Sequence, residues 1–224
     1  MRYGCNVRLN LDGGEHADEA EELYALADVV HIACGGHAGD ATSIERVIAS
    51  CRRAGARIGA HPSYVDREGF GRRALEVEPS LLAAQLETQC RAIPQAESVK
   101  PHGALYHAAH ASADVAEAIV RAVRNALGRV VIIGLAGGEL ERAARAAGHD
   151  YWREAFADRG VREGNLIPRG EPGALITDPA EAAARTRELV AAGAIETVCC
   201  HADTPASLAI VRAVRAALGP KCPT

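Results

Sequence analysis

The sequence predicts a single α/β domain folded as a closed (β/α) barrel, TIM-like and irregular, with about seven parallel strands. Short apolar runs alternate with helical patterns about seven times along the 224 residues, an order typical of parallel strands joined by right-handed crossovers. Polar clusters follow most of these runs, as at the carboxyl face of a barrel, whereas an open sheet concentrates function at one switch point. No composition break marks a linker, so one domain is expected over residues 1–224.

The first half of the chain holds four of the expected strand–helix units. Strands are expected at residues 5–11, 29–34 and 56–60, and the end of a fourth at 99–107. Apolar residues at helical spacing mark helices at 17–26, 44–51, 81–90 and 115–127. Thr42 and Glu45 form a capping-box pattern, and Pro79 is a favoured residue for a first helical turn.

The second half supplies three more units and one long loop. Strands are expected at residues 129–135, 151–157 and 196–200. Helices are expected at 140–147, from Asp178-Pro179 onward, and at 208–218 after a cap at Thr204-Pro205. The segment 160–177 reads as a loop, and loops of that length inside a compact domain are often functional.

Charge and composition exclude several classes of partner. Lys and Arg total 25 against 29 for Asp and Glu, which gives a net charge of -4 and no electrostatic attraction for nucleic acid or an anionic membrane. No run approaches the roughly 20 apolar residues of a membrane helix, and the N-terminus lacks a signal-peptide pattern. We therefore expect a cytoplasmic protein. Its seven cysteines lack CxxC spacing and are expected to be reduced and mostly buried.

Titratable groups cluster in the segment 59–73 and after the other expected strands. This segment contains His61, Tyr64, Arg72 and Arg73 among glycines that follow an apolar run. Four histidines each follow an expected strand within a few residues: His37, His61, His102 and His201. In a barrel they converge in one mouth, where histidine serves as a general base, an oxyanion donor or a metal ligand. The sequence alone does not choose among these roles.

Carboxylates and cations complete the candidate site. Asp12 and Asp158 end strands that read as buried, so each requires a partner such as Lys100 or Arg159. Asp40 and Asp203 precede helices, where an N-cap role competes with a binding role.

Lys100 stands in an apolar strand, where desolvation is expected to lower its pKa and a substrate carboxylate is a suitable partner. Arginines suited to carboxylate or phosphate binding are Arg72, Arg73, Arg159 and Arg169. Neither a GxxxxGK[ST] loop nor a GxGxxG motif is present.

Taken together, these motifs resemble those of the LamB/YcsF family, whose members are also known as the A subunits of 5-oxoprolinase. Asn10-Leu11-Asp12 is similar to its Asn-x-Asp, and residues 59–73 to its GAHPxYxDxxGFGRR. Further matches, in order, are residues 31–40 to NIACGFHAGD, 100–106 to KPHGALY, 154–159 with 168–169 to EVFADRxY…LVPR, and 201–205 to HGDNP.

The resemblance implies a barrel related to glycoside hydrolases and polysaccharide deacetylases. It also implies ATP-dependent opening of the lactam 5-oxoproline to glutamate, performed together with partner subunits B and C. The expected catalytic residues are Asp12, His37, His61, Lys100, His102, Asp158 and His201. The expected substrate-binding residues are Asn10, Asp40, Tyr64, Arg72, Arg73, Tyr106, Glu154, Arg159, Arg169 and Asp203. ATP is the expected cofactor of the assembled complex, and a divalent metal is a further possibility.

The chain departs from the family pattern at several positions and leaves two alternatives open. The departures are Arg8, His31, Gly36, Gly160 and Ala202, and the segment between Asp12 and His31 is short. One alternative is a metal-dependent hydrolase of the deacetylase type, with Asp12, His61 and His102 as ligands around a catalytic water. The other is a catalytically silent subunit that binds the lactam.

Overall fold

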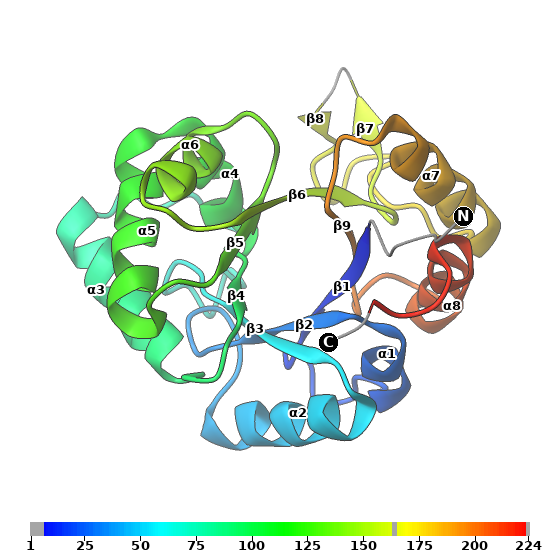
Figure 1. Ribbon diagram of the computed structural model, residues 1–224, viewed down its shortest axis with the longest axis horizontal. Coiled ribbons are helices and arrows are strands. Elements are labelled where there is room, and N and C mark those ends of the chain that lie inside the picture. Colours follow the sequence, from blue (N-terminus) through cyan, green and yellow to red (C-terminus); the bar gives the residue numbers. More distant parts are fainter. Residues whose placement is uncertain (1–6, 163–164, 223–224) are drawn as a thin grey trace.

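Seven parallel strands close into a barrel in the computed structural model, which describes residues 7–162 and 165–222 (Figure 1). In order around the barrel they are β1 (Arg8–Gly13), β2 (Val29–Ala33), β3 (Arg57–His61), β4 (Ser98–Val99), β5 (Val131–Gly134), β6 (Tyr151–Phe156) and β9 (Thr197–Cys200). Because β1 pairs in parallel with both β2 and β9, the first and last strands complete the closure. The predicted fold class is confirmed, including the number of strands.

Helices surround the barrel and bury one face each against the strands (Figure 1). They are α1 (Glu21–Leu26), α2 (Ala41–Ala54), α3 (Pro79–Arg91), α4 (Gly103–Ala111), α5 (Ala113–Leu127), α6 (Glu139–Ala146), α7 (Pro179–Ala192) and α8 (Ser207–Leu218). In α2 the apolar residues Ile44, Val47 and Ile48 recur at helical spacing and are buried. Gly55 then ends this helix in the left-handed conformation that glycine adopts most readily.

Alternation along β1 separates the apolar core from a polar barrel centre. Leu9 and Leu11 are fully buried in the core that the helices cover. Asn10 points the other way, because successive strand side chains alternate in direction. Its amide nitrogen donates to Glu154 Oε1 and to Thr197 Oγ1, both at 2.8 Å. The strands therefore hold a network of buried polar groups at the centre of the barrel.

Two segments differ from the sequence-based expectation. β4 ends at Val99, and the residues from Gly103 onward form α4, where the sequence indicated the end of a strand. Gly103 has φ +57°, and a Cβ there would lie 2.4 Å from Gly71 O, so a glycine is needed for the turn into this helix. The expected loop 160–177 contains the short antiparallel pair β7 (Val161–Arg162) and β8 (Asn165–Leu166).

Two predicted helix caps are also wrong. The N-cap of α2 is Asp40, which accepts from Ser43 N at 2.8 Å, and the capping box joins Asp40 and Ser43. Thr204 does not cap α8: the N-cap is Ala206, and the Thr204 hydroxyl donates to Asp158 Oδ2 at 2.7 Å. At α2 the cap position falls two residues before the predicted one, and at α8 a buried carboxylate binds the hydroxyl that the local pattern singled out.

Five cysteines are free and buried, as expected: Cys34, Cys51, Cys90, Cys199 and Cys200. Cys222 is disulfide-bonded, so the expectation of a reduced thiol is wrong there, and Cys5 and the start of the expected strand at 5–11 lie outside the described residues. Within the described part of the chain, no helix is long and apolar enough to cross a bilayer.

Candidate active site

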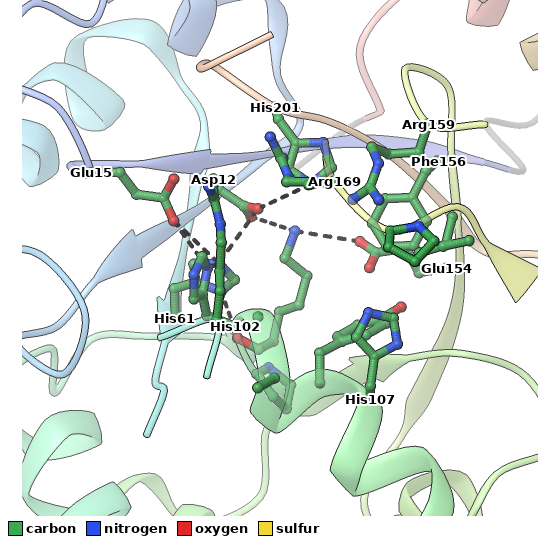
Figure 2. A pocket seen from close by; sticks show the side chains of 18 of the residues that line it. Asp12, Glu15, His61, His102, His107, Glu154, Phe156, Arg159, Arg169 and His201 are labelled. Atoms are coloured by element: carbon green, nitrogen blue, oxygen red, sulfur yellow. Dashed lines mark hydrogen bonds and ion pairs between the residues drawn. The ribbon is translucent and has the colours of Figure 1, made fainter. Parts of the chain in front are cut away.

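The carboxyl ends of the barrel strands open into a cavity of about 530 Å³ (Figure 2). Catalytic and binding groups of (β/α) barrels gather at this end, because each strand delivers the loop that follows it to the same face. The lining comes from segments far apart in sequence, from Asp12 near the end of β1 to His201 just after β9. The volume lies within the range typical of small-molecule sites.

Lys100 forms the floor of the cavity with Asp12, Glu154, Asn10 and Cys199 as partners. It is almost fully buried, and its ammonium group is ion-paired with Asp12 Oδ1 and lies 3.5 Å from Glu154 Oε1. It also donates to Asn10 Oδ1 at 3.0 Å. The predicted pairing of Asp12 with Lys100 is thus present.

Burial would lower the pKa of Lys100, but the charges of Asp12, Cys199 and Glu154 outweigh it and leave the pKa well above its usual value. The predicted lowering is therefore wrong. Burial would likewise raise the pKa of Asp12, yet the charges of His61 and Lys100 hold it well below its ordinary range. Lys100 and Asp12 therefore keep opposite charges inside the barrel.

Three histidines, His37, His61 and His102, gather around Glu15 on one side of the cavity; Figure 2 shows Glu15 with His61 and His102. Glu15 Oε1 lies 2.9 Å from His37 Nε2, 3.1 Å from His102 Nδ1 and 3.7 Å from His61 Nε2. The rings of His37 and His102 stack with centroids 3.7 Å apart. Burial lowers the pKa of His37 to about 4 and also lowers the pKa of His102. These nitrogen and carboxylate donors have the chemistry of transition-metal ligands.

His201 reaches the cavity from the end of β9 and is held by Asp158. Its Nδ1 lies 2.9 Å from Asp158 Oδ1, and its backbone N donates to Oδ2 at 2.8 Å. Its Nε2 faces Asp12 Oδ2 at 4.0 Å, and its ring stacks on Phe156. Burial would lower the pKa of His201, but the charge and hydrogen bond of Asp158 raise it above its usual value. A histidinium so placed can donate a proton into the cavity.

Arginines occupy the rim across from the histidine cluster (Figure 2). Arg159 is buried; its Nε donates to Ala174 O and its Nη2 to Ile167 O. Among the described residues no carboxylate lies within ion-pair distance of Arg159, whereas Arg169 and Arg72 both pair with Asp203 at 2.9 Å. A buried guanidinium without an acidic partner is suited to an anionic ligand.

The predicted site residues divide into three groups by position. Those that line the cavity are Asp12, His61, Arg72, Lys100, His102, Tyr106, Glu154, Arg159, Arg169 and His201. Those that lie behind the lining and hold it are Asn10, His37, Asp158 and Asp203.

The structure does not bring the remaining three into the cavity. Asp40 caps α2, Tyr64 is buried in the core, and Arg73 pairs with Asp66. The roles proposed for all these residues stay predictions.

Sequence reasoning missed several lining residues, above all Glu15, His107 and Phe156. Glu15 follows Asp12 by three residues, after two glycines at the end of β1, and that position was the available signal. His107 lies on α4, so the missed helix concealed it. Phe156 is an apolar strand residue whose pattern does not distinguish a cavity wall from the core.

The family model of LamB/YcsF matches residues 7–222. The chain belongs to the LamB/YcsF family. A lactam utilization protein from Thermus thermophilus is 34% identical to it, with a TM-score of 0.84 over 95% of this chain and 96% of that chain. The LamB/YcsF barrel also resembles more distant proteins, for which the likeness shows the fold alone. A family 4 carbohydrate esterase from Streptomyces lividans is 13% identical (TM-score 0.50, 95% and 86% covered), and an endoglucanase from Pseudomonas stutzeri is 11% identical (TM-score 0.54, 100% and 97% covered).

Proposed function

We propose that this protein is the A subunit of a 5-oxoprolinase, which opens the lactam ring of 5-oxoproline to give glutamate in a reaction coupled to ATP hydrolysis. Membership of the LamB/YcsF family over nearly the whole chain supports this proposal, as does the similarity to a lactam utilization protein. The observation that carries it is the buried Asp12–Lys100–Glu154 group at the floor of a cavity rimmed by arginines.

The residues at the floor match the demands of amide opening. A lactam is a resonance-stabilised amide, so its carbonyl oxygen must be activated before water attacks the carbon. The fixed charge of Lys100 is placed to stabilise the oxyanion that forms, because the side chain is buried and stays protonated. Asp12 stays ionised, and its Oδ2 is available as the base that takes a proton from the attacking water.

His201 and the arginines that line the cavity are placed to donate a proton and to bind the anionic groups of the substrate. The ring nitrogen of the lactam must gain a proton as its bond to the carbonyl carbon breaks, and His201 is placed to donate it. The substrate carboxylate is a suitable partner for Arg159, whose guanidinium has no carboxylate within ion-pair distance among the described residues. Arg72 and Arg169 lie near enough to the cavity to bind a phosphoryl group placed on the carbonyl oxygen.

ATP coupling enters the proposal with partner subunits B and C, as the family resemblance implies. The test is 5-oxoproline-dependent release of phosphate from ATP, measured with the chain alone and with subunits B and C added. We expect release only in the full mixture, together with one glutamate for each phosphate. Lys100→Met should abolish both products, because it removes the charge that faces the oxyanion.

The same assay separates the alternatives. Turnover of an amide or acetyl ester by the chain alone, without ATP, would replace the proposal by a hydrolase of the deacetylase type. Binding of 5-oxoproline without turnover, in a mixture whose B and C subunits work with a different member of the family, would assign a silent binding role.

A further inference from the structure

We propose that Glu15, His61 and His102 form a binding site for one divalent transition-metal ion, with its open coordination position facing the cavity. Glu15 follows β1, His61 is the last residue of β3 and His102 follows β4, and all three line the cavity. Their donor atoms, with that of His37, lie within 4.8 Å of one another. The inference concerns metal binding alone and does not depend on the proposed lactam chemistry.

In His61 and His102, one ring nitrogen is hydrogen-bonded to a backbone carbonyl, and this leaves the other nitrogen facing the cluster. His61 Nδ1 lies 2.7 Å from Lys100 O, and His102 Nε2 lies 2.9 Å from Phe70 O. A carbonyl oxygen only accepts, so each of these nitrogens carries the N–H, and in the neutral form of each ring the opposite nitrogen is the acceptor. His61 Nε2 and His102 Nδ1 therefore both point lone pairs inward, and they are only 3.0 Å apart.

The other groups around these two lone pairs are also acceptors. Glu15 Oε1 lies 3.1 Å from His102 Nδ1 and 3.7 Å from His61 Nε2, and Asp12 Oδ2 lies 3.4 Å from His61 Nε2. Converging acceptors of this kind repel one another unless a positive charge, a metal ion or a proton, lies between them. In tetrahedral zinc sites, bonds of about 2.0–2.1 Å place ligand atoms about 3.3 Å apart, which is close to the spacing here.

Surrounding contacts hold the three ligands as metal ligands are usually held. Carbonyl acceptors on the outer ring nitrogens orient each imidazole, as in most histidine–metal sites. His37 does not line the cavity; its Nε2 donates to Glu15 Oε1 at 2.9 Å and its ring stacks on His102, so it positions both. Gly71 has φ +66°, and a Cβ there would lie 2.9 Å from both His37 and His102, so a glycine is needed for this segment to pack beside the pair.

The ligand set differs in one member from the expectation based on sequence. Asp12, His61 and His102 were the expected ligands, but Asp12 Oδ1 is ion-paired with Lys100. Glu15 contacts both His37 and His102 and has no lysine or arginine partner among the described residues. Two imidazoles and one carboxylate with an open fourth position form a donor set used for catalytic zinc, and the same set also suits ferrous iron. In that position the ion would polarise a carbonyl oxygen or a bound water.

The test measures metal content and the spectrum of bound Co²⁺, with no need for turnover. The full chain is purified without a histidine tag, freed of metal by chelation, and titrated with Zn²⁺ by calorimetry and with Co²⁺ by visible spectroscopy. We expect one equivalent of either ion per chain, with the intense Co²⁺ absorption of a four- or five-coordinate site. An absence of stoichiometric binding in the wild-type chain would overturn the proposal and assign the cluster to a proton shared between the two rings.

Variants test the ligand set. Glu15→Gln, His61→Ala and His102→Ala should each lose the bound equivalent, whereas His37→Ala should weaken binding about 10- to 100-fold. His107→Ala is the matched control, because His107 lines the cavity away from the cluster, and it should bind as the wild type does. Retention in Asp12→Asn with loss in Glu15→Gln supports the proposed set, and the reverse result overturns it. Circular dichroism confirms that each variant compared is folded.

Discussion

At the scale of single residues, Lys100 is a buried side chain whose charge is balanced by its neighbours. Lys100 lies between two carboxylates inside the barrel, and their charges keep it protonated. Lys100→Met keeps the length of the side chain but leaves Asp12 and Glu154 without a counter-charge. We expect a loss of about 3–5 kcal/mol in the free energy of unfolding, the cost of breaking a buried ion pair from one side.

Urea denaturation at neutral pH measures this loss. Lys221→Met is the control, because within residues 7–162 and 165–222 the hydrogen bonds of this lysine go to the carbonyl oxygens of Ala25 and Ala54. Equal effects of the two substitutions would contradict the argument that Lys100 is held by charge.

Arg159 should set the affinity for an anionic substrate. Its buried guanidinium has two N–H groups bound to carbonyls and lacks an acidic partner among the described residues. Arg159→Gln should raise KM about 10- to 100-fold, since a hydrogen bond to a charged group contributes about 1.5–3 kcal/mol. Arg162→Gln, which removes an exposed arginine paired with Glu171, should leave KM unchanged. A fall in kcat with unchanged KM would instead place Arg159 in the chemical step.

His201 should make stability fall as the solution becomes alkaline. Its pKa is raised in the folded state, because the charge of Asp158 outweighs burial and the repulsion of Arg169. When the pKa of a histidine is higher in the folded state, protonation stabilises the fold. This stabilisation is complete at pH values below the pKa of the unfolded state, about 6.5, and it is lost as the pH rises through the pKa of the folded state. Each unit of difference between the folded and unfolded pKa contributes about 1.4 kcal/mol to the free energy of unfolding. Urea midpoints from pH 6 to pH 9 should fall in the wild type.

Asp158→Asn supplies the contrast for this titration, because the amide carries no charge to hold the proton. We expect the alkaline decline assigned to His201 to disappear in that variant. A nuclear magnetic resonance titration of the His201 ring gives the same comparison at one residue. An unchanged ring pKa in Asp158→Asn would remove the assignment.

Among the departures from the family pattern, Gly36 replaces a phenylalanine, and the side chain of Gln89 fills the space beside it. A Cβ at Gly36 would lie 2.3 Å from Gln89 Oε1 and 2.4 Å from Ser63 Oγ. Gln89 occupies this space with two hydrogen bonds to the backbone of Ser63. The phenylalanine of the family motif therefore does not fit here, and a polar side chain from α3 supports the loop instead.

At the scale of elements, caps show where local sequence signals succeed and where they fail. Asp178 caps α7 ahead of Pro179, as its sequence predicts. The pattern of Thr42 and Glu45 was misleading, because Asp40 lies two residues earlier and bonds Ser43 in both directions. Such competition between neighbouring polar side chains depends on backbone geometry that the sequence does not state. The same limit explains why α4 was missed, since its start depends on Gly103 turning against Gly71.

The cap assigns Asp40 a structural role that can be tested against its expected binding role. Asp40→Ala should lower Tm by about 2–4 °C, whereas Asp40→Asn should retain Tm because asparagine is as good an N-cap. Neither substitution should change KM, since Asp40 is exposed and does not line the cavity. Thermal unfolding and steady-state kinetics provide the two readouts. A higher KM with an unchanged Tm would return Asp40 to the substrate-binding group.

At the scale of the whole molecule, the sequence predicts which residues reach the cavity better than it predicts their partners. The ends of parallel strands share one face, so His61, His102 and His201 could be placed there from their positions alone. Their pairings could not, because His201 meets Asp158 across 43 residues and Lys100 meets Asn10 across 90. Register around a closed barrel fixes these pairs, and no local pattern encodes it.

Closure of the barrel also relies on a buried carboxylate at the opposite end from the cavity. Asp28, just before β2, accepts from Leu9 N in β1 and from Arg215 in α8, both at 2.7 Å. Its other oxygen accepts from Cys222 N at 2.7 Å. One side chain thus ties the first strand to the last helix and to the segment that follows it.

Asp28→Ala should therefore cost about 3–5 kcal/mol in the free energy of unfolding, because it leaves Arg215 buried without its counter-charge. Asp150→Ala, which removes an exposed carboxylate 3.5 Å from Arg129, should change little. Arg215→Leu alone should be costly for the same reason, but the double variant should cost less than the sum, since both charges leave together. Urea denaturation of the four proteins in this cycle measures the coupling. If the double variant lost as much free energy of unfolding as the two single variants added together, the Asp28–Arg215 ion pair would not couple β1 to α8, and packing alone would hold them together.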